Sequence, residues 1–95
     1  MQKYIILGNW TEKGRKSIEE VPKRLEANRK LIKDLNGKFS IYYTFGEYDF
    51  IVNVEIPDED SMAKFLLKLK GTENFSIKTL RAWDESEFVK MVSEI

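Results

Sequence analysis

The sequence predicts an α+β fold with the element order βαββαβ and one further helix at the C-terminus. From Phe39 to Glu55, apolar residues alternate with smaller or more polar ones on both sides of Gly46 and Glu47, which is the pattern of a β-hairpin. Segments with helical spacing of apolar residues lie before and after this hairpin, and a strand-like segment lies beyond each of them.

The hairpin also predicts a register. With Gly46 and Glu47 as a two-residue loop, eight apolar side chains fall on one face of the hairpin. The expected pairs are Phe45 with Tyr48, Tyr43 with Phe50, Ile41 with Val52, and Phe39 with Val54. The other face would carry Ser40, Tyr42, Thr44, Asp49, Ile51 and Asn53.

Before the hairpin we expect a strand from Lys3 to Trp10 and then a helix. Thr11 is suited to cap a short helical segment, and Pro22 is suited to begin the regular helix. The inward stripe of that helix is Val21, Leu25, Asn28, Leu31, Ile32 and Leu35. Asn36 and Gly37 supply the stop.

After the hairpin, Pro57 and Asp58 end a strand and cap a second helix that closes at Gly71. Its apolar stripe is Met62, Phe65, Leu66 and Leu69. A fourth strand is expected from Phe75 to Trp83. Asp84 and Glu87 form a capping box for a last helix that bears Phe88, Met91, Val92 and Ile95.

This element order favours a ferredoxin-like sheet, antiparallel in the order 4-1-3-2, with the helices on one side. In that topology the end of the first strand, the hairpin turn and the start of the main helix lie at the same end of the sheet. The residues expected to gather there are Asn9, Trp10, Thr11, Arg24, Gly46, Tyr48 and Asp49. Arg81 should lie near the opposite end.

The uncovered side of the sheet is expected to be too apolar for water. The residues assigned to it are Tyr4, Ile6, Gly8 and Trp10 from the first strand, and Tyr42 and Ile51 from the hairpin. A second copy packed across a two-fold axis would cover this face, so a homodimer is predicted. Assembly of dimers into a larger ring, through strand edges or the last helix, stays open.

The composition limits the function further. The 95 residues are expected to form one domain, spanning 1–95. Sixteen basic residues balance sixteen acidic ones, so binding to nucleic acid or to a membrane surface is not expected. The sequence has neither Cys nor His, which argues against a metal site or a bound cofactor. No targeting segment is visible, and we expect a cytoplasmic protein.

The sequence resembles the GYD domain family of the dimeric α/β barrel superfamily along its whole length. The matching positions are Asn9, Trp10, Thr11 and Gly14; Pro22, Arg24, Glu26 and Ala27; Tyr42 to Gly46, Tyr48 and Asp49; and Thr79 to Ala82. The sequence departs from the family at Trp83, where Phe is usual, and at Glu73, where Gly is common. The resemblance implies a dimeric barrel and no particular reaction, because the family is largely uncharacterised.

Asp49 and Tyr48 are the first candidates for a functional site. In the functional interpretation Asp49 accepts a proton or anchors a ligand, with Asn9, Arg24, Thr44 and Tyr48 around it. In the structural interpretation Asp49 accepts bonds from main-chain N–H groups or from Arg24 and pins the hairpin to the first helix. Whether the protein is an enzyme stays open. Relatives in the superfamily imply oxygenase-like or isomerase-like chemistry without a cofactor.

Two arginines have further roles to consider. Arg24 and the amides near Thr11 are candidates for holding an anionic ligand at the helix start, or else Arg24 is solvated or paired with a carboxylate. Arg81, close to Trp83, is a candidate interface residue, with exposure at a strand edge as the alternative.

An RNA-recognition module shares the same element order and is the alternative function. Residues 5–10 superficially resemble the first motif of that module, and Tyr48 and Phe50 lie where its second motif stacks bases. However, Ile6 replaces a stacking aromatic, and Asp49 adds a negative charge beside the expected RNA surface.

Overall fold

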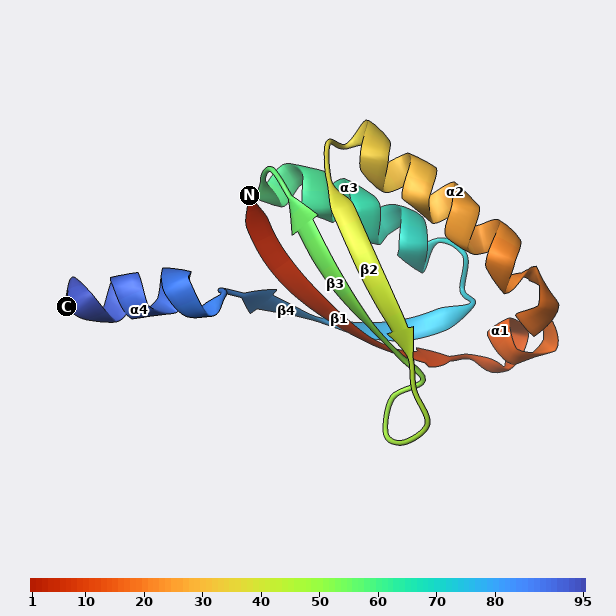
Figure 1. The fold of residues 1–95 in the computed structure, drawn as a ribbon. Helices are drawn as coiled ribbons and strands as arrows, with labels where there is room; N and C mark the ends of the chain where they lie inside the picture. Colours follow the sequence, from red (N-terminus) through yellow and green to blue (C-terminus); the bar gives the residue numbers. More distant parts are fainter.

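The computed structural model describes residues 1–95 and contains one four-stranded sheet, with two long helices on one of its faces (Figure 1). In chain order the elements are β1 (Gln2–Trp10), α1 (Glu12–Lys16), a 3-10 turn (Ile18–Glu20), α2 (Val21–Asp34), β2 (Lys38–Tyr43), β3 (Phe50–Ile56), α3 (Glu59–Lys70), β4 (Phe75–Ala82) and α4 (Glu85–Ser93).

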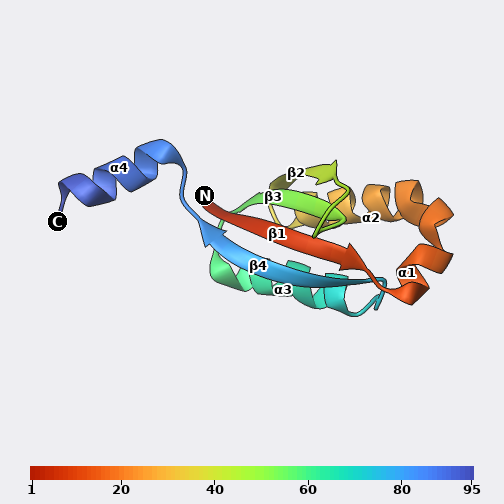
Figure 2. The ribbon, with the colours of Figure 1, turned by 90° about the horizontal axis from the view of Figure 1, so that it is seen from below.

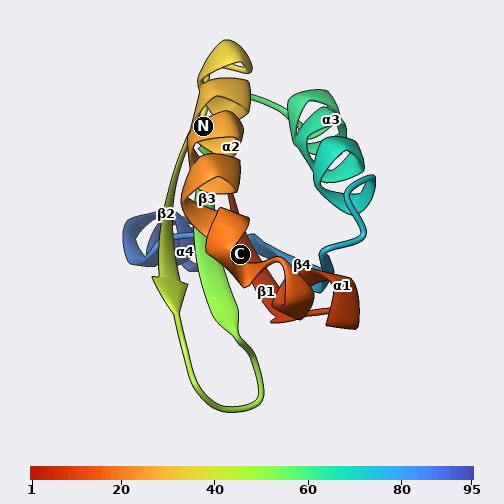
Figure 3. The same ribbon diagram turned by 90° about the vertical axis from the view of Figure 1, so that its right-hand side faces the viewer.

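The strand order is β2-β3-β1-β4, and every neighbouring pair is antiparallel. This confirms the predicted ferredoxin-like topology. Figure 3 shows α2 and α3 side by side on the same face of the sheet, and Figure 2 shows the strands β1 and β4 from the uncovered side. The two crossover helices therefore leave the other face of the sheet without cover.

The caps expected from the sequence are present. Thr11 Oγ1 accepts a hydrogen bond from Gly14 N at 3.1 Å, and Asp58 Oδ1 accepts one from Ser61 N at 2.8 Å. Pro22 lies in the first turn of α2, where its missing N–H costs nothing. Asn36 follows α2 with a φ of 60°, the left-handed conformation that often ends a helix.

The core lies between the helices and the sheet. Its buried residues are Ile6, Ile32, Phe50, Val52, Val54, Ile56, Met62, Phe65 and Leu69. The strand β3 contributes every second residue from Phe50 to Ile56, because alternate side chains of a strand face the same layer. The helix stripes predicted from the sequence supply the opposite wall.

The two-residue hairpin loop is wrong, although three of the four predicted pairs are present. Tyr43 lies opposite Phe50, Ile41 opposite Val52, and Phe39 opposite Val54. Phe45 and Tyr48 do not pair, and Phe45 is fully exposed. Thr44 N donates to Asp49 O at 2.8 Å, which leaves residues 45–48 as a four-residue loop.

The faces assigned to the first strand are also wrong. Tyr4, Ile6, Gly8 and Trp10 point toward the helices, because Ile6 lies opposite Val52 of the core and the other three share its parity. Ile6 is 1% exposed, and Tyr4 and Trp10 pack against the core. The open face therefore carries Ile5 and Leu7 from β1. Tyr42 and Ile51 lie opposite each other on that face, as predicted.

Helix α4 projects away from the rest of the molecule (Figures 1 and 2). None of its residues is buried. The exposed apolar side chains of the segment are Phe88, Val89, Met91, Val92 and Ile95. None of the helices has the length and apolar character needed to cross a membrane.

Candidate functional site

Asp49 lies where β1, β3 and the hairpin loop meet, and three hydrogen bonds hold it. Its Oδ2 accepts from Trp10 N at 2.9 Å, its N–H donates to Gly8 O at 2.8 Å, and its carbonyl accepts from Thr44 N. These bonds extend the pairing of the strands beyond Phe50. No hydrogen bond joins Asp49 to Arg24. The contacts of Asp49 agree with a structural role, but they hold the hairpin to Gly8 and Trp10 of β1 and not, as expected from the sequence, to the main helix.

Two of the other polar candidates at this end of the sheet donate hydrogen bonds to main-chain oxygens. Thr44 Oγ1 donates to Tyr48 O at 2.5 Å, and Thr11 Oγ1 donates to Glu73 O at 2.7 Å. Tyr48 has its ring 6.0 Å from Lys78 Nζ. Asn9 lies opposite Ser76 and, by alternation with Gly8, on the open face. These four residues lie at the expected end of the sheet but do not surround one cavity.

A cavity of about 60 Å³ lies between α2, α3 and the sheet. Its walls are mostly apolar. The lining residues are Ile6, Trp10, Val21, Arg24, Leu25, Asn28, Phe39, Ile41, Tyr43, Phe50, Val52, Phe65, Leu69, Phe75 and Ile77. Apolar walls with a few polar groups are typical of small-molecule sites, and the small volume restricts this one to a small ligand.

Aromatic rings form one end of this cavity. The rings of Trp10 and Tyr43 are stacked with centroids 6.2 Å apart, and Trp10 lies 5.1 Å from Phe50. Phe75 meets Phe50 edge-on at 5.6 Å. Gly8 makes room for Phe50, because a Cβ built on it would lie 2.1 Å from Phe50 Cζ. The missing side chain at Gly8 thus allows the ring to lie against β1.

Arg24 is the one charged residue of the cavity lining. Its Nη2 donates to the carbonyl oxygen of Ser17 and lies 3.4 Å from Ser17 Oγ. Its Nε and Nη1 are buried and have no hydrogen-bond partner. Buried polar atoms almost always have a hydrogen-bond partner. The two nitrogens of Arg24 without one therefore indicate that the cavity lacks an acceptor.

Tyr43 lies beside the arginines at the same site. Partial burial raises the pKa of Tyr43, which is 48% exposed, while the positive charges of Arg24 and Arg29 oppose that rise. Arg29 is held over the ring of Phe39 at 4.6 Å and donates to Phe39 O. The hydroxyl of Tyr43 therefore stays protonated at neutral pH, under the influence of two positive charges.

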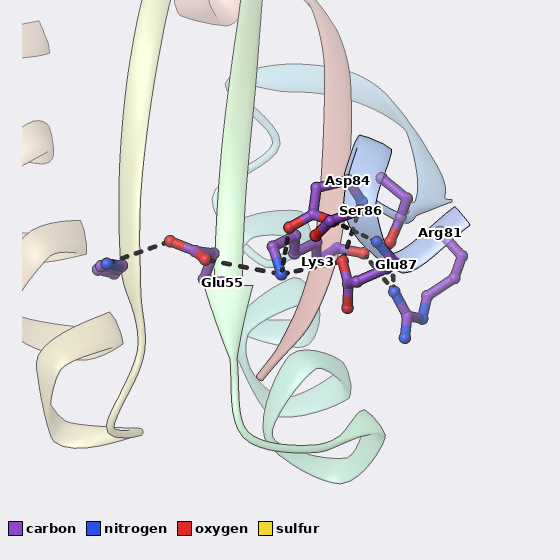
Figure 4. Close-up of polar contacts among 8 residues, drawn as sticks. Lys3, Glu55, Arg81, Asp84, Ser86 and Glu87 are labelled. Carbon is purple, nitrogen blue, oxygen red and sulfur yellow. Dashed lines mark hydrogen bonds and ion pairs between the residues drawn. The ribbon is translucent and has the colours of Figure 1, made fainter. Parts of the chain in front are cut away.

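A second polar cluster, which sequence reasoning missed, lies at the other end of the sheet (Figure 4). Lys3 Nζ lies 3.0 Å from Glu87 Oε1, 3.6 Å from Asp84 Oδ2 and 4.0 Å from Glu55 Oε1. The capping box raises the pKa of Lys3 through its hydrogen bond to Glu87. This cluster fixes the first turn of α4 to β1. The capping-box residues were visible in the sequence, but Lys3, about eighty positions away, was not linked to them.

Arg81 lies near this cluster, at the end of the sheet where it was expected. Its Nη1 donates to Lys3 O at 3.0 Å, and its guanidinium lies 4.6 Å from the ring of Trp83 and 5.4 Å from that of Tyr4. Arg81 is exposed, as Trp83 also is. Both stay available for an interface.

Sequence reasoning also missed the cavity roles of Trp10, Tyr43 and Phe75. The hairpin register already placed Tyr43 beside Phe50, which was a usable signal. The same register turns Phe50 toward the helices, where it is 5% exposed. The open face of β1 and β3 consequently offers no aromatic ring for the base stacking of an RNA-recognition module.

The family model described as the GYD domain matches residues 4–92. This chain belongs to the GYD domain family. One relative is the glutamine synthetase and cystathionine beta-lyase binding protein of Thermus thermophilus. It is 30% identical to this GYD protein over 84 residues, and the match covers 86% of this chain and 88% of the relative.

Two solved structures show the same fold as this GYD protein. HapK from Hahella chejuensis superposes with a TM-score of 0.65 at 10% identity, covering 88% of this chain and 92% of HapK. The protein At3g17210 from Arabidopsis thaliana gives a TM-score of 0.54 at 8% identity, covering 88% of this chain and 97% of that protein. At these identities the likeness concerns the fold alone.

Proposed function

We propose that this GYD protein is a cytoplasmic homodimer that binds a small organic molecule between its sheet and its helices. The observation that carries the proposal is the aromatic, mostly apolar cavity that contains one incompletely bonded arginine. Asp49, Thr11 and Thr44 hold the ends of strands and helices. The proposal therefore assigns the ligand to the cavity and not to the loop around Tyr48 and Asp49.

The dimer is expected to form through the open face of the sheet. Ile5, Leu7 and Ile51 lie at the centre of this face and are half-buried, while Tyr42 is 67% and Leu80 49% exposed. These side chains form an apolar patch with polar residues such as Lys38, Asn53 and Lys78 around it. In a two-fold symmetric dimer the same patch of each copy would pack against that of the other, which removes both patches from water.

A titration followed by ¹H–¹⁵N NMR tests the ligand proposal. Short aliphatic compounds should move the indole N–H signal of Trp10. The variant Trp83→Phe assigns this signal, because Trp10 is then the one indole left. Leu25→Phe narrows the cavity and should abolish the saturable shifts, whereas Leu67→Phe, on the exposed face of α3, should leave them unchanged. Shifts that survive Leu25→Phe would place the ligand elsewhere and contradict the proposal.

A second candidate function is binding to a metabolic enzyme. The name of the Thermus thermophilus relative favours it, and α4 offers exposed apolar side chains for such a contact, with Phe88 58% and Val92 52% exposed. Purified glutamine synthetase and cystathionine β-lyase of the source organism would each be titrated with the protein by calorimetry. Binding that is lost in Phe88→Glu and kept in Leu67→Glu would support this function, and no heat with either enzyme would contradict it.

A further inference from the structure

The positively charged guanidinium of Arg24 lines a cavity that has no negatively charged residue in its walls. None of the lining residues is Asp or Glu, and the only bonds of the guanidinium go from Nη2 to the carbonyl and hydroxyl oxygens of Ser17. Nε and Nη1 remain buried without a partner. An incompletely bonded guanidinium beside apolar walls is costly, and an acceptor brought in by a ligand would remove that cost.

We propose that the ligand of this cavity is a small organic acid, whose carboxylate binds Arg24 and whose apolar part lies against Trp10, Phe50 and Phe75. The inference rests on the ligand-binding function proposed above and adds the chemical class of the ligand. The carboxylate accepts hydrogen bonds from the free nitrogens of Arg24, and bonds between charged partners are stronger than those between neutral ones.

The surroundings of Arg24 agree with an anion and not with a cation. Arg29, an exposed residue of α2 outside the lining, adds a second positive charge that acts on Tyr43, a lining residue. Asn28, on the next turn of α2, also reaches the lining. The one charged group of the lining is therefore a cation, and the cavity offers no carboxylate to a basic ligand.

The size of the cavity limits the apolar part of the acid. A volume of about 60 Å³ is smaller than the roughly 150 Å³ that receives benzene in an engineered cavity. A carboxylate with a short aliphatic chain fits this space best, and an aromatic acid would require α2 to move outward. Butyrate and pentanoate are accordingly the first probes, and benzoate tests how far the cavity expands.

The test compares each acid with its amide, which has nearly the same shape and no charge. Butyrate and butyramide, and pentanoate and pentanamide, are titrated into the full-length protein, and the signals of Arg24 Nε–H and the Trp10 indole are followed by NMR. We expect the acids to bind about tenfold more tightly than the amides or better. Arg24→Met should remove this preference, while Lys23→Met, an exposed neighbour on α2 with the same change in charge, should keep it.

Equal affinity for acid and amide in the wild-type protein would overturn this inference and leave the proposed ligand-binding function standing. Loss of the preference in Lys23→Met as well would also overturn it, because the effect would then come from overall charge. Absence of saturable binding by any acid, any amide and any neutral ring compound would overturn both. If Arg24→Met does not fold, Arg24→Gln replaces it, and the comparison in the wild-type protein decides the question by itself.

Discussion

The main-chain N–H of Trp10 donates a hydrogen bond of 2.9 Å to Oδ2 of Asp49, which joins the last residue of β1 to the residue before β3. The side chain of Asp49 thereby replaces a strand partner at the point where the hairpin loop leaves the sheet. Trp10, in turn, forms a wall of the cavity. A residue that the sequence suggested as a catalytic candidate thus helps to position the cavity.

Asp49→Asn should lower the stability of the fold. The amide keeps an acceptor for Trp10 N but loses the charge, so we expect a loss of about 1 kcal/mol in the free energy of unfolding. Urea unfolding followed by circular dichroism measures it. Glu47→Gln, an exposed carboxylate of the same loop, serves as the control and should change little. An unaltered midpoint for Asp49→Asn would refute the structural role of this residue.

Gly8→Ala should be destabilising because the added methyl group meets the ring of Phe50 at 2.1 Å. We expect a cost of about 1 to 3 kcal/mol, typical of an overpacked core. Gly71→Ala is the matched control, since its nearest neighbouring atom is 3.5 Å away. In thermal unfolding, Gly8→Ala should have a clearly lower melting temperature than Gly71→Ala. Equal melting temperatures would show that Phe50 does not lie over Gly8.

The first turn of α4 should depend on pH. The N–H of Glu87 lowers the pKa of Asp84 below 3.8, and the N–H of Asp84 lowers the pKa of Glu87 below 4.5. A carboxyl group with a lowered pKa stabilises the folded form above its unfolded pKa, and this contribution disappears as the pH falls through the folded value. The helical ¹³Cα shifts of residues 85–93 should therefore decrease below about pH 4.

Helix α3 provides the control for this acid titration. Its cap Asp58 also has a lowered pKa, because Ser61 N–H bonds to it, but Met62 and Phe65 bury this helix in the core. The ¹³Cα shifts of α3 should persist where those of α4 decline, because a helix without packing depends on its cap. Parallel behaviour of both helices, or an α4 unaffected at about pH 2, would contradict the expectation.

Light scattering measures the mass of the protein in solution and so tests whether it is a dimer. The wild-type protein should show twice the chain mass of 11.2 kDa. Leu7→Asp introduces a charge at the centre of the open face and should yield the monomer, while Leu67→Asp, exposed on α3, should leave the dimer intact. A wild-type monomer at micromolar concentration, or a dimer that persists in Leu7→Asp, would rule out this interface.

The fold was largely predictable because its signals are local. Alternation marks the hairpin, Asp84 and Glu87 mark a capping box, and Pro22 marks a helix start. The orientation of the first strand was not predictable in the same way. Ile5, Ile6 and Leu7 are all apolar, so they do not show which alternate residues face the helices. The close approach of Gly8 and Phe50 indicates which side of the strand faces the core. This contact joins positions far apart in the sequence, so no local pattern predicts it.

The candidate site was predictable only in part. Arg24 was recognised as a possible anion-binding residue, and the structure places it on the cavity wall. Asp49 was recognised by its position, but its partners Trp10 and Gly8 depend on how the loop leaves the sheet. Trp10, assigned to the open face, lies instead inside the cavity lining. No pattern in the sequence near α4 predicts that this helix projects away from the rest of the molecule.

Intermolecular NOEs between a bound short-chain acid and the protein would locate the ligand directly. We expect NOEs from the methyl and methylene protons of pentanoate to the rings of Trp10, Phe50 and Phe75. NOEs confined to Tyr42 and Leu7 on the open face, or to Phe88 on α4, would contradict a binding site between the sheet and the helices.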